Sequence, residues 1–347
     1  MEGNEGHGLN NEPTSMTKTP ATVAMALVLA TIWISCPAAN AITLARDGKP
    51  TATIVVRQSA LDAKDHPLQP GTIPSADQKV KLAARDLQEY IEKISGARLP
   101  IVSEEQPVTG PVILVGQSKR TDALGVKIPT GLTRDRREEG LVIRAKGDTL
   151  LLAGNEARPY NGTYYAVAEL LHRLGVRWFM PSAFGEIVPQ QPTITIGDVE
   201  VRESPDFPMR TYWSHMNAEM IPLEYLWKLR NKMQPDVTPM IDVAGDSSLN
   251  KYLPEKELAK TRPELFAKTL GGEPNPYLPN LTNPEAIQIV AEKMKAELRE
   301  RRKDPNGMTD WLGFSPNDGA PVDFHDETMK LNMGFPTPRD ARACPTT

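Results

Sequence analysis

Apolar residues recur with two different spacings along this chain, and the spacings predict its first elements. Strand-like runs rich in β-branched residues lie at Thr51 to Val56 and at Pro111 to Val115, each flanked by turn formers. Between them, apolar positions recur at helical spacing from Asp77 to Ser95. Ser75 or Asp77 is available as the N-cap, and Gly96 follows the last turn. The pattern therefore predicts a helix with one face packed on a sheet.

The next segment contains a hairpin and a second helix. Gly140 to Ala145 and Thr149 to Ala153 are strand-like and are joined through a Lys-Gly-Asp turn. A helical pattern then covers Gly162 to Leu174, Gly175 ends it, and Val176 to Met180 is again strand-like. We therefore expect an α/β chain that begins, over residues 42–204, with an α+β domain of two helices on a mainly antiparallel sheet.

The pattern changes after Val201 to Pro208, a stretch with two prolines and no periodicity, where we place a domain boundary. Strands alternating with helices then predict βα units and a parallel barrel or sheet within residues 205–347. The predicted elements are strands at Met209 to Trp213, Val237 to Val243 and Asp310 to Ser315, and helices at Leu223 to Met233 and Pro284 to Arg302.

Charge and motif content exclude several classes of function. The net charge of -4 is spread without long blocks of one sign, so the basic surface that nucleic acid binding needs is not indicated. The five histidines lie far apart without the spacing of paired metal ligands, so the sequence predicts no metal site. No Gly-rich phosphate loop or Ser-based nucleophile elbow is found, and no cofactor is expected.

Residues 1–41 have the pattern of a secretory signal peptide. An apolar run from Ala21 to Cys36 follows Lys18, and a small-residue sequence ends at Ala41, the expected cleavage site. The run is shorter than the roughly 20 residues of a membrane span. We therefore expect export to the periplasm or the cell exterior and no stable membrane span after cleavage; a retained membrane anchor is the alternative. Cleavage leaves Cys344 as the only cysteine, so no internal disulfide is expected.

The run from Leu151 to Pro189 resembles the accessory domain that precedes the catalytic barrel in β-hexosaminidases and α-glucuronidases. It has a strand that ends in Gly154 and a helix that carries Gly162 to Ala166, followed by glycines, prolines and aromatic residues in the same order. The earlier run from Ile113 to Gly125 fits the same domain. The resemblance implies that residues 42–204 are an accessory domain that does no chemistry itself.

The segment after the boundary is similar to a large bacterial family of glycosidase-like proteins, the domain of unknown function 4838. The resemblance implies a (β/α)₈ TIM barrel, which needs about 250 residues. Far fewer residues follow Pro208, so we expect an incomplete, C-terminally truncated barrel. Gly245-Asp246-Ser247 departs from the family, in which Gly-His is frequent at this place. The matching residues are Phe207 to Trp213, Arg262 to Ala267, Leu281 to Glu285 and Phe314 to Gly319.

Asp318 is the candidate catalytic residue. Glycoside hydrolysis generally uses two carboxyl groups, which in a barrel lie at strand C-termini. Asp318 follows the predicted strand that ends at Ser315, and Asn317 beside it is a candidate substrate-binding residue. A plain turn is the alternative, because Asn-Asp-Gly favours turns. We expect the second catalytic group to lie beyond Thr347.

Two further residues are candidates for binding substrate. The β-hexosaminidase resemblance implies that Arg210 hydrogen-bonds sugar hydroxyls, and its fork of donors also suits a uronic acid carboxylate; a structural salt bridge is the alternative. Trp213 is a candidate for stacking on a sugar, with packing at a strand end as the alternative. We expect His215 to be a solvated loop residue. The pair Asp326-Glu327 resembles an acidic pair of β-hexosaminidases, but it lacks their glycine-rich strand end, which predicts a short helix or loop instead.

The leading hypothesis is therefore an exported glycoside hydrolase-like protein that acts on glycosidic bonds of polysaccharide or oligosaccharide. The alternative is a non-catalytic carbohydrate-binding or cell-surface protein on the same scaffold. Carbohydrate is the expected partner in both cases. The sugar, the linkage, the stereochemical course and the oligomeric state stay open.

Overall fold

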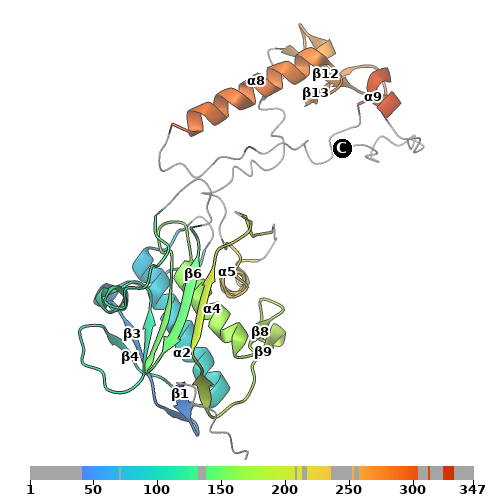
Figure 1. Ribbon diagram of the computed structural model, residues 1–347. Coiled ribbons are helices and arrows are strands. Elements are labelled where there is room, and N and C mark those ends of the chain that lie inside the picture. The colour runs from blue at the N-terminus through green and yellow to red at the C-terminus, as the bar shows by residue number, and fades with distance from the viewer. Residues whose placement is uncertain are drawn as a thin grey trace, which may run out of the picture. The chain divides into compact units, whose positions relative to one another are not determined.

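The computed structural model describes residues 41–69, 72–131, 138–207, 209–212, 217–235, 252–253, 258–303, 312 and 323–331. The described chain is mixed α/β, with several sheets and helices (Figure 1). None of its helices is both long enough and apolar enough to cross a membrane.

A six-stranded sheet forms the centre of residues 42–204, the predicted first domain, in the order β11-β6-β7-β5-β3-β4. The ladders β3/β4, β3/β5 and β5/β7 are parallel, whereas β6/β7 and β6/β11 are antiparallel. The expectation of a mainly antiparallel sheet is therefore wrong for the sheet on which the helices pack. The helical crossover between β3 and β4 returns the chain to the same end of the sheet, which makes these strands parallel. The strands are β3 (Thr53–Val56), β4 (Ile101–Ser103), β5 (Val112–Val115), β6 (Leu141–Lys146), β7 (Thr149–Gly154) and β11 (Val199–Glu203).

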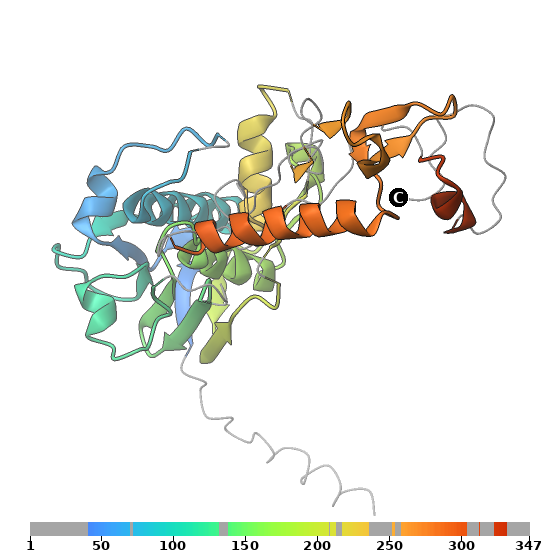
Figure 2. The same cartoon turned by 90° about the horizontal axis from the view of Figure 1, so that it is seen from above.

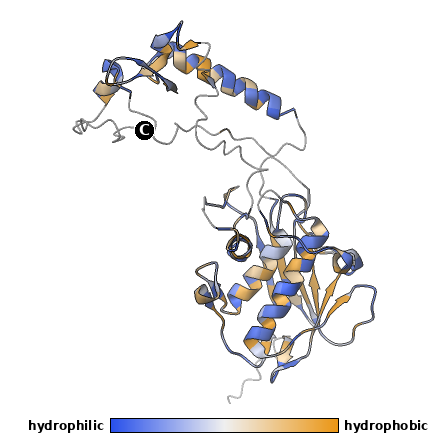
Figure 3. Cartoon of the chain, turned by 180° about the vertical axis from the view of Figure 1, so that it is seen from behind, coloured by the Kyte–Doolittle hydropathy of each residue, from blue (hydrophilic) through white to orange (hydrophobic). Residues whose placement is uncertain are grey.

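Two long helices cover one face of this sheet, as predicted. The helix α2 (Ala76–Ser95) begins at Ser75, whose side chain accepts from the Gln78 amide in a reciprocal capping box. It ends at Gly96, which has the left-handed φ of 79°. The helix α4 (Gly162–Arg173) packs beside it. Figure 2 shows α2 to one side of the strands, and Figure 3 shows both helices in front of the apolar sheet.

The two faces of the sheet bury different apolar side chains. The larger core lies under α2 and α4 and includes Leu87, Ile91 and Leu152. A smaller core on the opposite face includes Leu114 and Leu151. Successive residues of β7, such as Leu151 and Leu152, face opposite sides of the sheet, and both sides are buried. This explains why β7 is apolar throughout.

Short elements complete the first domain. The helices α1 (Gln58–Asp62) and α3 (Lys119–Asp122) follow β3 and β5. The predicted strand at Val176 to Met180 is reduced to a two-residue pairing of β8 with β9. The remaining short elements are β1 (Ile42–Arg46), β2 (Lys49–Pro50), β8 (Arg177–Trp178), η1 (Ala183–Gly185), β9 (Glu186–Ile187) and β10 (Ile194–Ile196).

Residues just beyond the predicted boundary pack on the first domain. The helix α5 (Ile221–Arg230) is confirmed and contacts α4. Residues 209–212, predicted to begin a strand, have no strand structure. The strand β11 occupies the start of the stretch that was predicted to be non-periodic, and its Val199 and Val201 pack against the core.

The last described segment has a small core of its own. The helix α8 (Pro284–Arg301) is confirmed and begins at Asn283, whose side chain accepts from two backbone amides. The hairpin of β12 (Phe266–Lys268) and β13 (Pro274–Pro279) is not predicted by the sequence pattern. The segment also contains η2 (Pro263–Leu265) and α9 (Asp326–Leu331).

The barrel stays a prediction. Among the described residues after 204, the strands that pair are the antiparallel β12 and β13. The predicted strand at Val237 to Val243 lies outside the described residues, as does that at Asp310 to Ser315 apart from Leu312.

Candidate functional site

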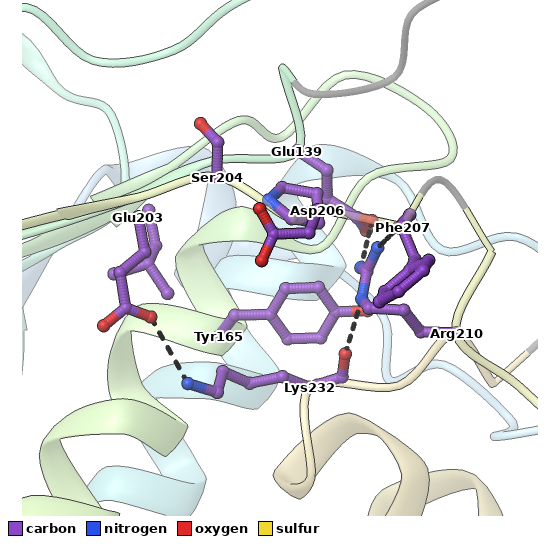
Figure 4. Close-up of a pocket in the computed structure, with 10 residues that line it drawn as sticks. Glu139, Tyr165, Glu203, Ser204, Asp206, Phe207, Arg210 and Lys232 are labelled. Carbon is purple, nitrogen blue, oxygen red and sulfur yellow. Dashed lines mark hydrogen bonds and ion pairs between the residues drawn. The ribbon is translucent and has the colours of Figure 1, made fainter.

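A cavity of about 230 Å³ opens where the chain leaves β11 and passes to α5. Leu141 is the first residue of β6 and Glu139 lies two residues before it, Tyr165 comes from α4, and Lys232 follows α5. Figure 4 shows Lys232 reaching toward Glu203 on one side and Arg210 toward Glu139 on the other, with the Tyr165 ring between the two pairs. The lining residues are Glu139, Leu141, Tyr165, Glu203, Ser204, Pro205, Asp206, Phe207, Arg210 and Lys232.

Arg210 lines the cavity but already donates to three protein groups. Its Nη2 lies 2.5 Å from Oε2 of Glu139, its Nε donates to the Lys232 carbonyl at 3.0 Å, and its Nη1 donates to the Phe207 carbonyl at 2.8 Å. Burial of the guanidinium acts to lower the pKa of Arg210, but the Glu139 charge and the further interactions with Glu139 and Tyr165 together outweigh it, and the pKa is raised. The structural salt bridge, one of the two predicted roles of Arg210, is therefore present.

Glu139 is the buried partner of this ion pair, with 3% of the residue exposed. Its Oε1 accepts from the Asn161 amide at 3.0 Å, and its Oε2 also accepts from the Gln234 side chain at 3.3 Å. Gln234 in turn exchanges two hydrogen bonds with the Arg210 backbone. A buried carboxylate needs this degree of hydrogen bonding, and the same contacts hold Arg210 in place beside Glu139.

Lys232 forms the other set of ion pairs at the cavity, with two glutamates. Its ammonium lies 2.6 Å from Glu169 and 3.3 Å from Glu203. It has a left-handed φ of 55°, which is unusual for a residue with a side chain, and its carbonyl points to Arg210. The Tyr165 hydroxyl donates to the Met233 carbonyl at 3.0 Å. The carbonyls of Lys232 and Met233 thus both accept from cavity side chains, which holds the turn after α5 against the cavity.

Asp206 and Phe207 form the open rim. Both are exposed, and 71% of Phe207 is accessible. Within the part of the chain that the structure describes, no hydrogen bond or ion pair engages the Asp206 carboxylate. A free carboxylate beside an open aromatic ring can accept hydrogen bonds from a ligand and pack on its apolar face.

The described structure does not test the other predicted site residues. Asp318, Asn317, Trp213 and His215 lie outside the described residues, so their roles stay predictions. The pair Asp326-Glu327 is in the exposed first turn of α9, as the prediction of a short helix requires.

The sequence pattern did not identify most residues of the cavity. Glu139 lies two residues before a strand, and Lys232 lies in a turn, so neither belongs to a motif. Phe207 is part of the quoted Phe-Pro-Met-Arg match, which was the one usable signal. In the described ranges, no group of three or more His, Cys, Asp or Glu side chains is arranged to hold a metal ion.

Residues 180–310 match the family described as Domain of unknown function (DUF4838). A search of curated proteins finds no match. A similar solved structure is a family GH115 4-O-methyl-α-glucuronidase with specificity for decorated arabinogalactans, with a TM-score of 0.33, 19% identity, and coverage of 49% of this chain and 19% of the enzyme. Another is CpGH84D, with a TM-score of 0.27, 14% identity, and coverage of 50% of this chain and 22% of CpGH84D. The chain thus spans about a fifth of the length of each.

Proposed function

We propose that this chain is a carbohydrate-directed, glycoside hydrolase-like protein and that the cavity beside β11 binds a sugar. The observation that carries the proposal is the open rim, where the Asp206 carboxylate and the Phe207 ring border a cavity lined by both charged and apolar side chains. Sugars present hydroxyl donors around an apolar ring face, and a carboxylate next to an aromatic ring meets both.

Sequence similarity supports the same class of function. The match to the domain of unknown function 4838 includes Asp206, Phe207 and Arg210. It also overlaps the run that resembles the accessory domain of β-hexosaminidases and α-glucuronidases. In this proposal residues 205–347 are the first part of a glycosidase-like TIM barrel, and residues 1–41 direct export.

The chemistry would depend on carboxyl groups. Asp206 would hold the sugar by accepting hydrogen bonds from its hydroxyls, and Asp318 would act as general acid or base. Because three of the Arg210 nitrogens are engaged by protein, its contribution to the sugar would come from the remaining N–H groups.

A binding experiment tests the sugar site. The full chain is titrated with xylooligosaccharides, chitooligosaccharides and methyl glucuronides, and variants are compared with matched controls. Asp206→Asn and Phe207→Ala should each weaken binding by about fivefold to tenfold. Asp148→Asn, at an exposed turn, and Phe184→Ala, 91% exposed, should leave binding unchanged. Equal losses in test and control variants would refute the site.

A hydrolysis experiment separates the two functional hypotheses. The same proteins are incubated with aryl glycosides and with the oligosaccharides that bind. Hydrolysis that Asp318→Asn abolishes supports a glycoside hydrolase. Retained binding with no hydrolysis supports the non-catalytic carbohydrate-binding protein.

A further inference from the structure

Two neighbouring cavities lie against α2 in the first domain, apart from the cavity beside β11. One has a volume of about 180 Å³ and is lined mainly by charged and polar residues, with two leucines, of α2 and of the segment after α1. The other has a volume of about 240 Å³ and is lined mainly by apolar residues. Lys81 and Arg85, one helical turn apart, line both cavities. The two cavities therefore share a cationic wall.

The charges of the polar cavity do not balance. Lys64, Lys81 and Arg85 carry three positive charges, and Asp65 carries the negative charge among the lining residues. The Asp65 carboxylate accepts from both shared cations through one oxygen, at 3.1 Å from Lys81 Nζ and 2.8 Å from Arg85 Nη1. Lys81 Nζ and Arg85 Nη1 are thus already spaced so that one carboxylate oxygen can contact both.

Asp65 is a weakly held occupant of that position. Its side chain is 62% exposed, and Arg85 is 52% exposed. The pair of Asp65 with Arg85 is exposed on both sides and contributes little to stability, whereas Lys81, the other partner, is only 16% exposed. A carboxylate from solution that replaces Asp65 therefore gives up little at Arg85 and keeps the partly buried Lys81 cation paired.

The segment that bears Asp65 is fastened around the cavity. Lys81 Nζ donates to the Ala63 carbonyl at 2.5 Å, and Gln78 Nε2 donates to the Lys64 carbonyl at 3.0 Å. The Leu68 amide donates to His66 Nδ1 at 3.1 Å. Leu68 itself lines the cavity with a left-handed φ of 54°. A backbone held in this way keeps the cavity formed before a ligand arrives.

The second cavity defines the rest of the ligand. Its remaining walls are Val56, Leu61, Ala84 and Ile101, from β3, α1, α2 and β4. An apolar cavity of about 150 Å³ is known to hold benzene. The larger volume here accommodates a phenyl group or a branched alkyl chain.

We propose that these two cavities form one binding site for a small carboxylic acid with a compact apolar body. The carboxylate replaces that of Asp65 between Lys81 and Arg85, and the apolar body enters the cavity formed by Val56, Leu61, Ala84 and Ile101. Two features of the wall select this class: paired cations around a carboxylate, and apolar side chains on their other side.

The test uses 3-phenylpropionate as probe, with 3-phenylpropionamide, acetate and inorganic phosphate for comparison. Binding to the full chain is measured by calorimetry and by amide NMR shifts. The site predicts that 3-phenylpropionate binds at least about tenfold more tightly than the other three, because only it has both a carboxylate and an apolar body. Equal binding of the amide, or of phosphate, would overturn the proposed class. Absence of measurable 3-phenylpropionate binding would overturn the site.

Variants give changes of opposite sign. Arg85→Met should weaken 3-phenylpropionate binding about threefold or more, whereas Asp65→Asn should strengthen it by removing the competing carboxylate. Arg98→Met and Glu92→Gln are matched controls, because they alter an exposed ion pair at the C-terminal end of the same helix. If Asp65→Asn weakens binding, or if Arg85→Met behaves like Arg98→Met, the proposal is wrong.

Discussion

Arg230 binds Asp86 through two hydrogen bonds, Nε to Oδ2 at 3.0 Å and Nη2 to Oδ1 at 3.1 Å, and this ion pair joins α5 to α2. Asp86 is 5% exposed, and it also accepts from the Tyr164 hydroxyl of α4. The guanidinium lies 5.0 Å from the centre of the Tyr90 ring. A helix from the segment predicted to begin the barrel is thus attached to both α2 and α4, the two long helices on the six-stranded sheet.

Arg230→Met should therefore destabilise the protein. Removing one partner leaves the Asp86 charge buried with the Tyr164 hydroxyl as its one donor in the described part of the chain, at a cost of about 3 kcal/mol. The free energy of unfolding in urea measures the loss. Arg98→Met, which breaks an exposed pair with Glu92, should cost about 0.5 kcal/mol or less. Similar losses in the two variants would show that the Arg230 ion pair does not stabilise the fold.

A second prediction concerns two glycines that bring β7 against α4. A Cβ on Gly154 would lie 2.3 Å from the Gly162 carbonyl carbon, and a Cβ on Gly162 would lie 2.4 Å from the Asn155 nitrogen. Both obstacles are backbone atoms, so no side chain can move aside. Gly162→Ala should lower the free energy of unfolding by about 3 kcal/mol or more. Gly147→Asn is the control, since its hairpin turn has open space and tolerates Asn at φ 57°.

The strand and the helix that meet at Gly154 and Gly162 show what the local sequence determines. The strand and the helix that carry them are predictable from apolar spacing and from turn residues. Gly96 likewise marks the end of α2, and the structure shows Ser75, one of the two N-cap candidates, at its start. In each case, atoms within a few residues determine the outcome.

Strand pairing was not predictable in the same way. The runs around Ile54 and Ile113 are equally compatible with parallel and antiparallel neighbours, because their buried faces are apolar in both arrangements. The cavity residues pose the same difficulty. Glu139 and Arg210 are 71 residues apart, and their contact depends on the packing of α5 against α4.

A third prediction tests whether Glu139 and Arg210 act as a pair. Glu139→Gln removes the charge that faces the guanidinium, and Arg210→Met leaves the Glu139 carboxylate buried without its main partner. Each single variant should lose about 2 kcal/mol of unfolding free energy. The double variant should lose clearly less than the sum, with a coupling free energy of about 1 kcal/mol or more. Additive losses would mean that Arg210 is held by the Lys232 and Phe207 carbonyls alone.

The last prediction concerns acid. His172 packs its ring 5.2 Å from Trp178, and its buried Nε2 has no hydrogen-bond partner among the described residues. Burial, together with the positive charges of Arg177 and Lys232, lowers the pKa of His172 below its ordinary value of 6.5. The unfolded chain therefore takes up the proton first as pH falls.

Stability from neutral His172 is complete above pH 6.5 and is lost as pH falls from 6.5 toward the lower pKa of the folded protein. His172→Phe keeps an aromatic ring beside Trp178 but cannot be protonated. Its free energy of unfolding should decrease less between about pH 7.5 and about pH 5.5 than that of the unaltered protein. Some dependence should remain, because burial also lowers the pKa of His66. Identical pH profiles for the two proteins would show that His172 is accessible enough to be protonated without unfolding.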